Sequence, residues 1–367
     1  MYKRSSYPKL EINLSKLKHN IEQVTKKCGE QGIAVAGVIK GCTGLFPCVQ
    51  QFEAAGVSFI ASSRLEQLAE LKEKGIKTPL LMIRIPLLSE VYDLVRYCDA
   101  SLNSEIEVLK ALNEAALSQG KIHEVILMAD CGDLREGFWD KEEMAQAALM
   151  VENEMDGLKL IGTGFNIGCY GSIMATPEKL QELVDVTEMI EDRIGRKLEF
   201  ISGGASTSYF RVLEGNMPER INMLRIGEVL LLPDFMYGEF GFDSSDLYSD
   251  VFTLKAEVIE VKDKPTHPVG DIGFDAFGHR IEYVDRGIRK RALLGLGKCD
   301  FGDYNELILN NSDMEVIGAS SDHTIVDVQD AFDKGIEVKV GDVLSFSLNY
   351  ATIVYVSNSR NITVEYV

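Results

Sequence analysis

Four polar residues follow apolar runs in the first part of the sequence, either directly or after a short loop: Lys40, Arg135, Asn166 and Arg225. A lysine amine can bond covalently to an aldehyde, an arginine can neutralise an anion, and an amide can donate or accept a hydrogen bond. Each residue taken alone is typical of an ordinary solvated loop. Their shared position after strand-like runs predicts that they meet in one reactive centre.

Two glycine-containing segments are candidates for binding a phosphate group. In the first, residues 202–208 (SGGASTS), Gly203, Gly204 and Ser206 precede a helical pattern; in the second, Gly227 precedes Glu228. Backbone N–H groups in such turns and at helix starts point towards anions. A phosphate anchor with a lysine across from it is what pyridoxal 5′-phosphate (PLP) requires, because its aldehyde reacts with the amine and its phosphate fixes the ring.

The elements that must position these residues alternate between strand and helix patterns through roughly residue 240. Several helix patterns begin at a capping residue or a proline and end at a glycine. Nine strand-like segments with helical crossovers favour a closed (β/α)8 barrel of the TIM type plus one spare strand. No GxGxxG motif supports a dinucleotide-binding sheet. In such a barrel the reactive groups lie at the carboxyl ends of the strands.

The pattern changes after about residue 243, where short β-branched runs are separated by Gly, Asp and Pro. We therefore predict an α/β chain with two domains: a PLP-binding (β/α)8 barrel at 14–242 and a C-terminal all-β domain at 243–367.

Composition limits the possible partners. Lys and Arg number 38 against 57 Asp and Glu, a net charge of −19, which disfavours nucleic acids and anionic membranes and leaves small zwitterionic or cationic ligands. The apolar runs are too short to cross a bilayer, and no signal-peptide pattern is present, so we expect a cytoplasmic protein. Seven cysteines without a CxxC pair, and only five histidines, predict neither a disulfide framework nor a metal site.

Longer motifs resemble those of the PLP-dependent alanine racemase family, in particular its ornithine racemase branch. The most specific are DCGDLREG at 130–137 and LRIGE at 224–228; further segments lie at 7–13, 38–41, 84–90, 101–105, 275–278, 286–292 and 321–323. The resemblance spans essentially the whole chain. It implies that the first strand, within segment 1–13, joins the β-domain, and that the protein is a homodimer with head-to-tail shared active sites.

The resemblance also implies a role for each barrel residue. Lys40 corresponds to the lysine that binds the cofactor and transfers a proton on one face, Arg225 to the arginine at the pyridine nitrogen, and Arg135 to the arginine near the phenolic oxygen. Asn166 stands where the family has a ring-stacking histidine. The phosphate-binding positions correspond to Gly204, Ser206, Gly227 and Glu228.

The sequence departs from the family pattern at three further positions. Gly44 replaces a phosphate-binding tyrosine, and Met128 replaces a carbamylated lysine. The family's second base, a β-domain tyrosine, aligns with Lys298, which we take as the first candidate for that role. Cys299, Asp300 and His323 are weaker candidates. Asp322, His323 and Cys299 are also candidates for contacting the substrate, with Asp322 the candidate partner for a cationic substrate side chain.

These features predict an isomerase that removes and returns the Cα proton of a basic amino acid such as ornithine. An alanine or broad-specificity racemase remains an alternative, and so does a PLP-binding homeostasis protein without turnover. A decarboxylase-like relative has little support, because Cys299 alone does not make that family's specificity loop.

Overall fold

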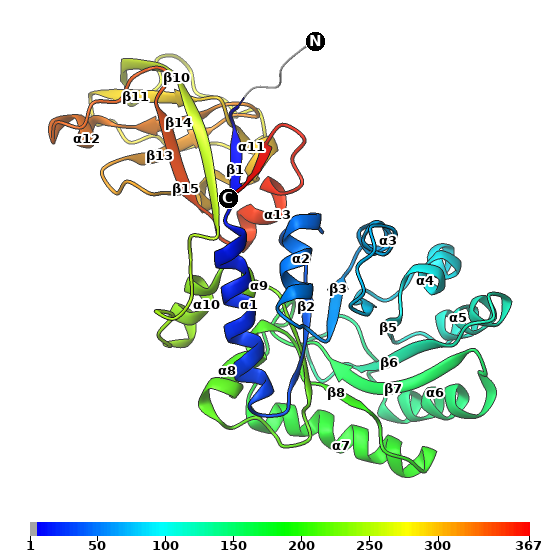
Figure 1. The fold of residues 1–367 in the computed structure, drawn as a ribbon. Coiled ribbons are helices and arrows are strands. Elements are labelled where there is room, and N and C mark those ends of the chain that lie inside the picture. Colours follow the sequence, from blue (N-terminus) through cyan, green and yellow to red (C-terminus); the bar gives the residue numbers. More distant parts are fainter. Residues whose placement is uncertain (1–5) are drawn as a thin grey trace. The chain divides into compact units, whose positions relative to one another are not determined.

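Short apolar segments between residues 34 and 226 form the parallel strands of a closed barrel in the computed structural model, which describes residues 6–367 (Figure 1). The eight strands are β2 (Ala34–Val38), β3 (Phe59–Ser62), β4 (Leu80–Met82), β5 (Ala100–Asn103), β6 (His123–Ala129), β7 (Leu158–Phe165), β8 (Phe200–Ser202) and β9 (Met223–Ile226). Pairing of Ala34 with Met223 and of Gly37 with Ile226 closes the ring. The predicted (β/α)8 barrel is therefore confirmed.

Helices follow the strands and cover the outside of the barrel (Figure 1). They are α1 (Leu14–Gly29), α2 (Phe46–Ala54), α3 (Leu65–Glu73), α4 (Val91–Tyr97), α5 (Ile106–Ser118), α6 (Lys141–Glu154), α7 (Pro177–Ile194), α8 (Ser206–Glu214), α9 (Glu228–Leu231) and α10 (Pro233–Phe240), with a 3₁₀ turn at Leu88–Glu90. The Thr176 hydroxyl caps α7, and Gly195 ends it at φ +75°. Among the described helices, none is both long and apolar enough to cross a lipid bilayer.

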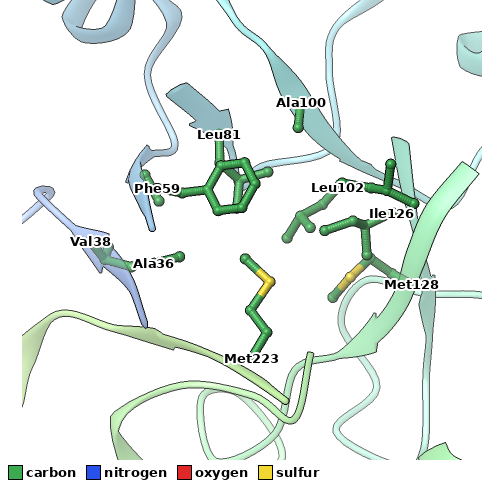
Figure 2. Close-up of a cluster of buried hydrophobic side chains, with 11 residues drawn as sticks. Ala36, Val38, Phe59, Leu81, Ala100, Leu102, Ile126, Met128 and Met223 are labelled. Carbon is green, nitrogen blue, oxygen red and sulfur yellow. The ribbon is translucent and has the colours of Figure 1, made fainter. Parts of the chain in front are cut away.

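The barrel interior is filled by apolar side chains from alternate strand positions, as Figure 2 shows. Val38, the last residue of β2, and Met223, the first residue of β9, both belong to this cluster. Because side chains alternate between the two faces of a strand, residues two positions further along point to the same inner side. That places Lys40 and Arg225 over the packed interior at the carboxyl end.

The second part of the chain forms a mainly antiparallel sheet. Its strands are β1 (Lys9–Ile12), β10 (Phe252–Pro265), β11 (Ile288–Leu294), β12 (Ile308–Leu309), β13 (Glu315–Ala319), β14 (Thr324–Asp327), β15 (Val343–Ser347) and β16 (Thr363–Tyr366), in the order β12-β15-β10-β11-β14-β13. As the resemblance implied, β1 joins this sheet by pairing with β10 and β16. Residues 1–5 of the predicted segment 1–13 lie outside the described residues.

Short helices interrupt this sheet domain, which the sequence predicted as all-β: α11 (Lys298–Phe301), α12 (Gln329–Asp333), α13 (Tyr350–Val356) and a 3₁₀ turn at Tyr304–Glu306. Asn349 caps α13 by accepting a hydrogen bond from the Thr352 amide. These helices are one or two turns long, too short for the hydrophobic periodicity that reveals a helix in sequence.

The chain separates into two compact units, one of residues 16–248 and one of residues up to 15 together with 249–367. The sequence placed the change at 243. Residues 243–248 belong to the barrel unit because Lys27 pairs with Asp246 at 2.5 Å, and because Asn20 exchanges two 2.8 Å hydrogen bonds with the backbone of Tyr248.

A buried histidine makes the stability of the barrel dependent on pH. His123 contacts the Ser101 hydroxyl at 2.8 Å, and burial lowers its pKa to about 4. Between pH 6.5 and 4 the unfolded chain therefore takes up a proton that the native chain does not, which removes native stability as the pH falls. We expect wild type to lose about 3 kcal/mol more unfolding free energy across this range than His123→Gln. Urea denaturation of both proteins at a fixed cofactor concentration measures the difference; equal pH slopes would contradict this assignment.

Candidate active site

Arg225 is a buried cation at the carboxyl end of the barrel. Its side chain, in a residue only 4% exposed, donates to the Ser202 hydroxyl at 2.5 Å and to the Phe165 carbonyl at 2.7 Å. Burial lowers its pKa to about 10, an effect that the negative charge of Glu136 opposes, so the guanidinium stays charged at neutral pH. All its hydrogen bonds within the described chain go to neutral groups. A guanidinium has five N–H donors, so donor capacity remains for a ligand.

Lys40 follows β2 at the same end and is half-buried. Burial lowers the pKa of its amine; a negative charge on Cys169 opposes this shift, and the charge of Arg135 adds to it. A lowered pKa increases the fraction of uncharged amine, the form that attacks a carbonyl. The next turn is tight: the Thr43 amide donates to the Lys40 carbonyl at 3.1 Å. Gly44, at the family's tyrosine position, lies beside Gln67. A Cβ added at residue 44 would be 3.1 Å from the Cβ of Gln67.

Arg135 lies in the loop after β6, where Asp130 organises the backbone. The Asp130 carboxylate accepts hydrogen bonds from the amides of Gly132 at 2.8 Å and Leu134 at 3.1 Å. The Arg135 guanidinium is bound to Glu136, with Nε 2.5 Å from Oε2. Arg135 thus lies at the predicted end of the barrel, and the Glu136 carboxylate accepts hydrogen bonds from some of its N–H groups.

Asp133 connects two loops of the barrel mouth, a role that sequence reasoning missed. It is 1% exposed, and its carboxylate accepts hydrogen bonds from the amides of Gly168, Tyr170 and Gly171, each at 3.1 Å. These bonds hold the loop after β7 against the loop after β6. The only sequence signal is the position of Asp133 inside the DCGDLREG motif, which does not reveal its partners.

Two buried polar groups at this end have no partner among the described residues. Asn166, immediately after β7, is 8% exposed, and its Nδ2 donates no hydrogen bond; the Ser208 hydroxyl in α8 is likewise unsatisfied. Gly164 faces Met128 of the interior cluster, so alternation points Asn166 inward as well. Since buried polar groups are normally paired, these two indicate a ligand-binding position.

The predicted phosphate-binding residues are brought together by β8, β9 and the helices that follow them. The Ser206 hydroxyl accepts long hydrogen bonds from the amides of Gly227 at 3.3 Å and Val229 at 3.5 Å. Gly204 has φ +100°, and a Cβ there would lie 2.6 Å from the Ser208 hydroxyl, so glycine is required. Burial raises the pKa of the Glu228 carboxyl beside this group.

This set of residues fits PLP. The half-buried amine of Lys40 suits its aldehyde, Arg225 supplies a cation for its ring, and Ser206 with the adjacent glycine turns suits its phosphate. The unsatisfied donors of Asn166 and Ser208 are further positions for cofactor or substrate atoms. Within residues 6–367, no group of three or more His, Cys, Asp or Glu side chains has the arrangement of a metal site.

The other candidates lie in the sheet unit and form their own cluster. The ammonium of Lys298 sits 4.2 Å from the centroid of Phe277, 5.3 Å from that of Tyr304 and 3.8 Å from Oδ2 of Asp275. We call these four residues the Lys298 cluster. Its ammonium is thus held by two aromatic rings and a carboxylate.

The weaker candidates for the second base and for substrate contact lie near Lys298 in sequence or in the loop between β13 and β14, and most contact other residues of the sheet unit. Asp300 is buried and accepts hydrogen bonds from Ser359 at 2.7 Å and from Asn361 at 2.9 Å. Burial, with the charges of Asp300 and Asp322, raises the pKa of Cys299 to about 11. Asp322 accepts a hydrogen bond from Ser321 at 2.7 Å and is exposed, as is His323.

Barrel, sheet domain and site together define the class of protein. The model of the alanine racemase N-terminal domain matches residues 12–233, more than half of the chain. The protein belongs to the alanine racemase family, whose cofactor is PLP.

Among individual relatives, an ornithine racemase from Acetoanaerobium sticklandii is 38% identical over 362 residues, which cover 98% of each chain. A lysine racemase from Thermotoga maritima is 37% identical over 347 residues, 95% of each chain. Solved alanine racemases share the fold. The enzyme from Clostridium difficile 630 gives a TM-score of 0.73 at 20% identity, covering 98% of this chain and 95% of that one. The Streptomyces lavendulae enzyme gives 0.74 at 17%, covering 98% and 96%.

Replacing Asp133 tests its function as a connector of the two loops. Asp133→Asn keeps the size but presents an N–H group where the carboxylate accepts a hydrogen bond, so the loop after β7 loses charge-assisted bonds worth about 1.5–3 kcal/mol each. We expect amide hydrogen exchange at residues 168, 170 and 171 to accelerate about tenfold or more. Asp140→Asn, a matched change at the cap of α6, should leave those amides unchanged. Equal exchange in both variants would show that Asp133 does not hold the loop.

Proposed function

We propose that this protein is a PLP-dependent racemase that interconverts the L and D forms of a basic amino acid such as ornithine or lysine. The observation that carries the proposal is Arg225: a buried cation bonded to neutral groups only, at the same barrel end as a lysine with a lowered pKa. The two relatives above 35% identity are named for ornithine and lysine, which supports a basic substrate.

When bound, PLP would supply the electron withdrawal that makes the Cα proton of an amino-acid substrate acidic. Lys40 is proposed to hold the cofactor between turnovers and, once released, to accept or donate a proton at Cα through Nζ. Its lowered pKa favours both tasks near neutral pH, because the amine and ammonium forms are then closer in population.

Arg225 directs the reaction towards proton exchange. The Arg225 guanidinium keeps its proton near neutral pH, so it would donate a hydrogen bond to the ring nitrogen of PLP and leave that nitrogen unprotonated. Burial in a pocket of neutral groups keeps this donor fixed. The weaker electron withdrawal that results favours reversible removal of the Cα proton over transamination or decarboxylation.

The remaining cofactor residues are proposed to bind and orient. Ser206, Gly204 and Gly227 would hold the phosphate with hydroxyl and backbone N–H groups, and Glu228 would contribute its backbone amide. Arg135 would turn from Glu136 towards the phenolic oxygen, and Asn166 would use its free Nδ2 near the ring. Lys298 stays a prediction for the second proton-transfer group, and Asp322 one for the partner of the substrate's cationic side chain.

We further propose a head-to-tail homodimer, as the family resemblance implies, and a cytoplasmic location. All seven cysteines are free, which agrees with a reducing compartment.

The amine of Lys40 provides the direct test. Lys40→Ala should abolish borohydride fixation of the cofactor and lower interconversion of L- and D-ornithine by at least about 10²-fold, because both the covalent attachment and one proton-transfer group are lost. Lys110→Ala, which removes an exposed lysine paired with Glu107, serves as the control and should retain both properties. Chiral chromatography of ornithine, lysine and alanine after incubation in deuterated water measures the rate and identifies the substrate.

Two outcomes would contradict the proposal. Wild-type protein that binds PLP at Lys40 but interconverts none of a panel of amino acids would point to the binding-protein alternative. A strong preference for alanine over ornithine and lysine would overturn the assignment to basic substrates.

A further inference from the structure

Racemisation requires proton transfer on both faces of Cα, because a single fixed base tends to return the proton to the side from which it came. Lys40 accounts for one face. The candidate from sequence alignment, Lys298, already has its ammonium surrounded by Phe277, Tyr304 and Asp275. These contacts tie the side chain to the loop between β10 and β11. Asp300 is buried and hydrogen-bonded to Ser359 and Asn361.

Cys169 is a thiol in the loop that follows β7 in the barrel unit. It is one of two exposed cysteines; the other five are buried. The amides on either side of it, Gly168 and Tyr170, both donate to Asp133, so the backbone at residue 169 is held in place at the carboxyl end of the barrel. In the order of barrel strands, β7 is separated from β2 by β8 and β9. Cys169 and Lys40 therefore approach the mouth from different sides.

The loop that carries Cys169 starts from a strand end that Arg225 contacts, since the carbonyl of Phe165, four residues before the thiol, accepts a hydrogen bond from Arg225 at 2.7 Å. Apart from burial, a negative charge at Cys169 has the largest effect on the pKa of Lys40, which it raises. It also raises the pKa of Arg225, against the lowering caused by burial. Since Lys40 and Arg225 both lie on the inner side of the barrel end, Cys169 lies within electrostatic reach of the space between them.

A second, independent observation indicates that a ligand occupies this place. Asn166, three residues before Cys169 on the same loop, is more than nine-tenths buried, points inward, and leaves its Nδ2 without a partner. An unsatisfied buried donor on the loop that carries the thiol indicates that bound ligand atoms complete the site.

We infer that Cys169 is the second proton-transfer residue, acting on the substrate Cα from the face that Lys40 does not reach. This inference rests on the proposed racemase function. In one direction the Cys169 thiolate takes the Cα proton and becomes a thiol, while the C–H electron pair stays on the substrate. The Lys40 ammonium then gives a proton to the opposite face and becomes an amine. One proton passing through water from the thiol to the amine then restores the starting state for another turnover in this direction. In the other direction the Lys40 amine takes the Cα proton, the Cys169 thiol gives one to the opposite face, and the resetting transfer runs from ammonium to thiolate.

Isotope exchange with the holoenzyme distinguishes a one-face from a two-face enzyme. In deuterated water, Cys169→Ala should still exchange the Cα proton of the enantiomer that faces Lys40, with retention of configuration. Exchange of the other enantiomer, and racemisation in both directions, should fall by about 10²–10⁴-fold. Tyr170→Phe changes the neighbouring exposed residue and keeps the loop backbone. Its racemisation rate should stay within about threefold of wild type. This control separates the effect of losing the thiol from the effect of disturbing the loop.

Three results would overturn the inference while leaving the racemase function intact: near wild-type racemisation by Cys169→Ala, the one-face exchange pattern in Lys298→Ala instead, or the same pattern in Tyr170→Phe. Failure of the wild-type protein to racemise any amino acid would instead remove the proposed function.

Alkylation of the wild-type holoenzyme gives a second readout that does not depend on a folded variant. Iodoacetamide should label Cys169 and abolish racemisation, and saturating ornithine or lysine should slow labelling of Cys169 at least tenfold relative to Cys299, as measured by peptide mass spectrometry. Racemisation that survives complete labelling of Cys169, or labelling that substrate does not slow, would contradict the inference.

Discussion

A buried guanidinium connects three strands at the carboxyl end of the barrel. Arg225 extends from β9. Its guanidinium donates hydrogen bonds to the Ser202 hydroxyl at the end of β8 and to the Phe165 carbonyl at the end of β7. A charge removed from water is costly unless its donors are satisfied, so this residue both requires and fixes the positions of its neighbours. Phe165 directly precedes Asn166, and Arg225 lies two residues before Gly227. One side chain is thus linked in sequence to both the proposed ring-binding residue, Asn166, and the proposed phosphate-binding residue, Gly227.

The loops around this centre are held by carboxylates acting on backbone amides. Asp130 shapes its own loop, whereas Asp133 reaches across to the loop after β7 and accepts three of its amides. Carboxylate bonds to N–H groups are among the stronger hydrogen bonds in proteins. Both loops therefore present their proposed site residues, Arg135 on one and Asn166 with Cys169 on the other, from a fixed backbone. Such positioning suits a reaction in which a proton moves over a short distance between fixed atoms.

Much of this arrangement was predictable from sequence, because strand alternation and the geometry of a (β/α)8 barrel are local rules. The positions of Lys40, Asn166 and Arg225 after apolar runs were enough to place them at one end of the barrel, and the glycines near Ser206 and Gly227 were enough to suggest a phosphate site. What sequence could not show depends on contacts between distant segments. Asp133 binds amides 35 to 38 residues away. Lys298 is surrounded by Asp275 and Phe277 only once the loop between β10 and β11 has folded. The charge effect of Cys169 on Lys40 and Arg225 likewise requires the ring of strands to close.

NMR of the cofactor's ring nitrogen tests most directly whether Arg225 keeps that nitrogen unprotonated. Protein reconstituted with PLP labelled with ¹⁵N in the ring should give the chemical shift of a neutral pyridine nitrogen near neutral pH. A shift characteristic of a protonated pyridinium would contradict the account, because Arg225 would then not face that nitrogen as its hydrogen-bond donor.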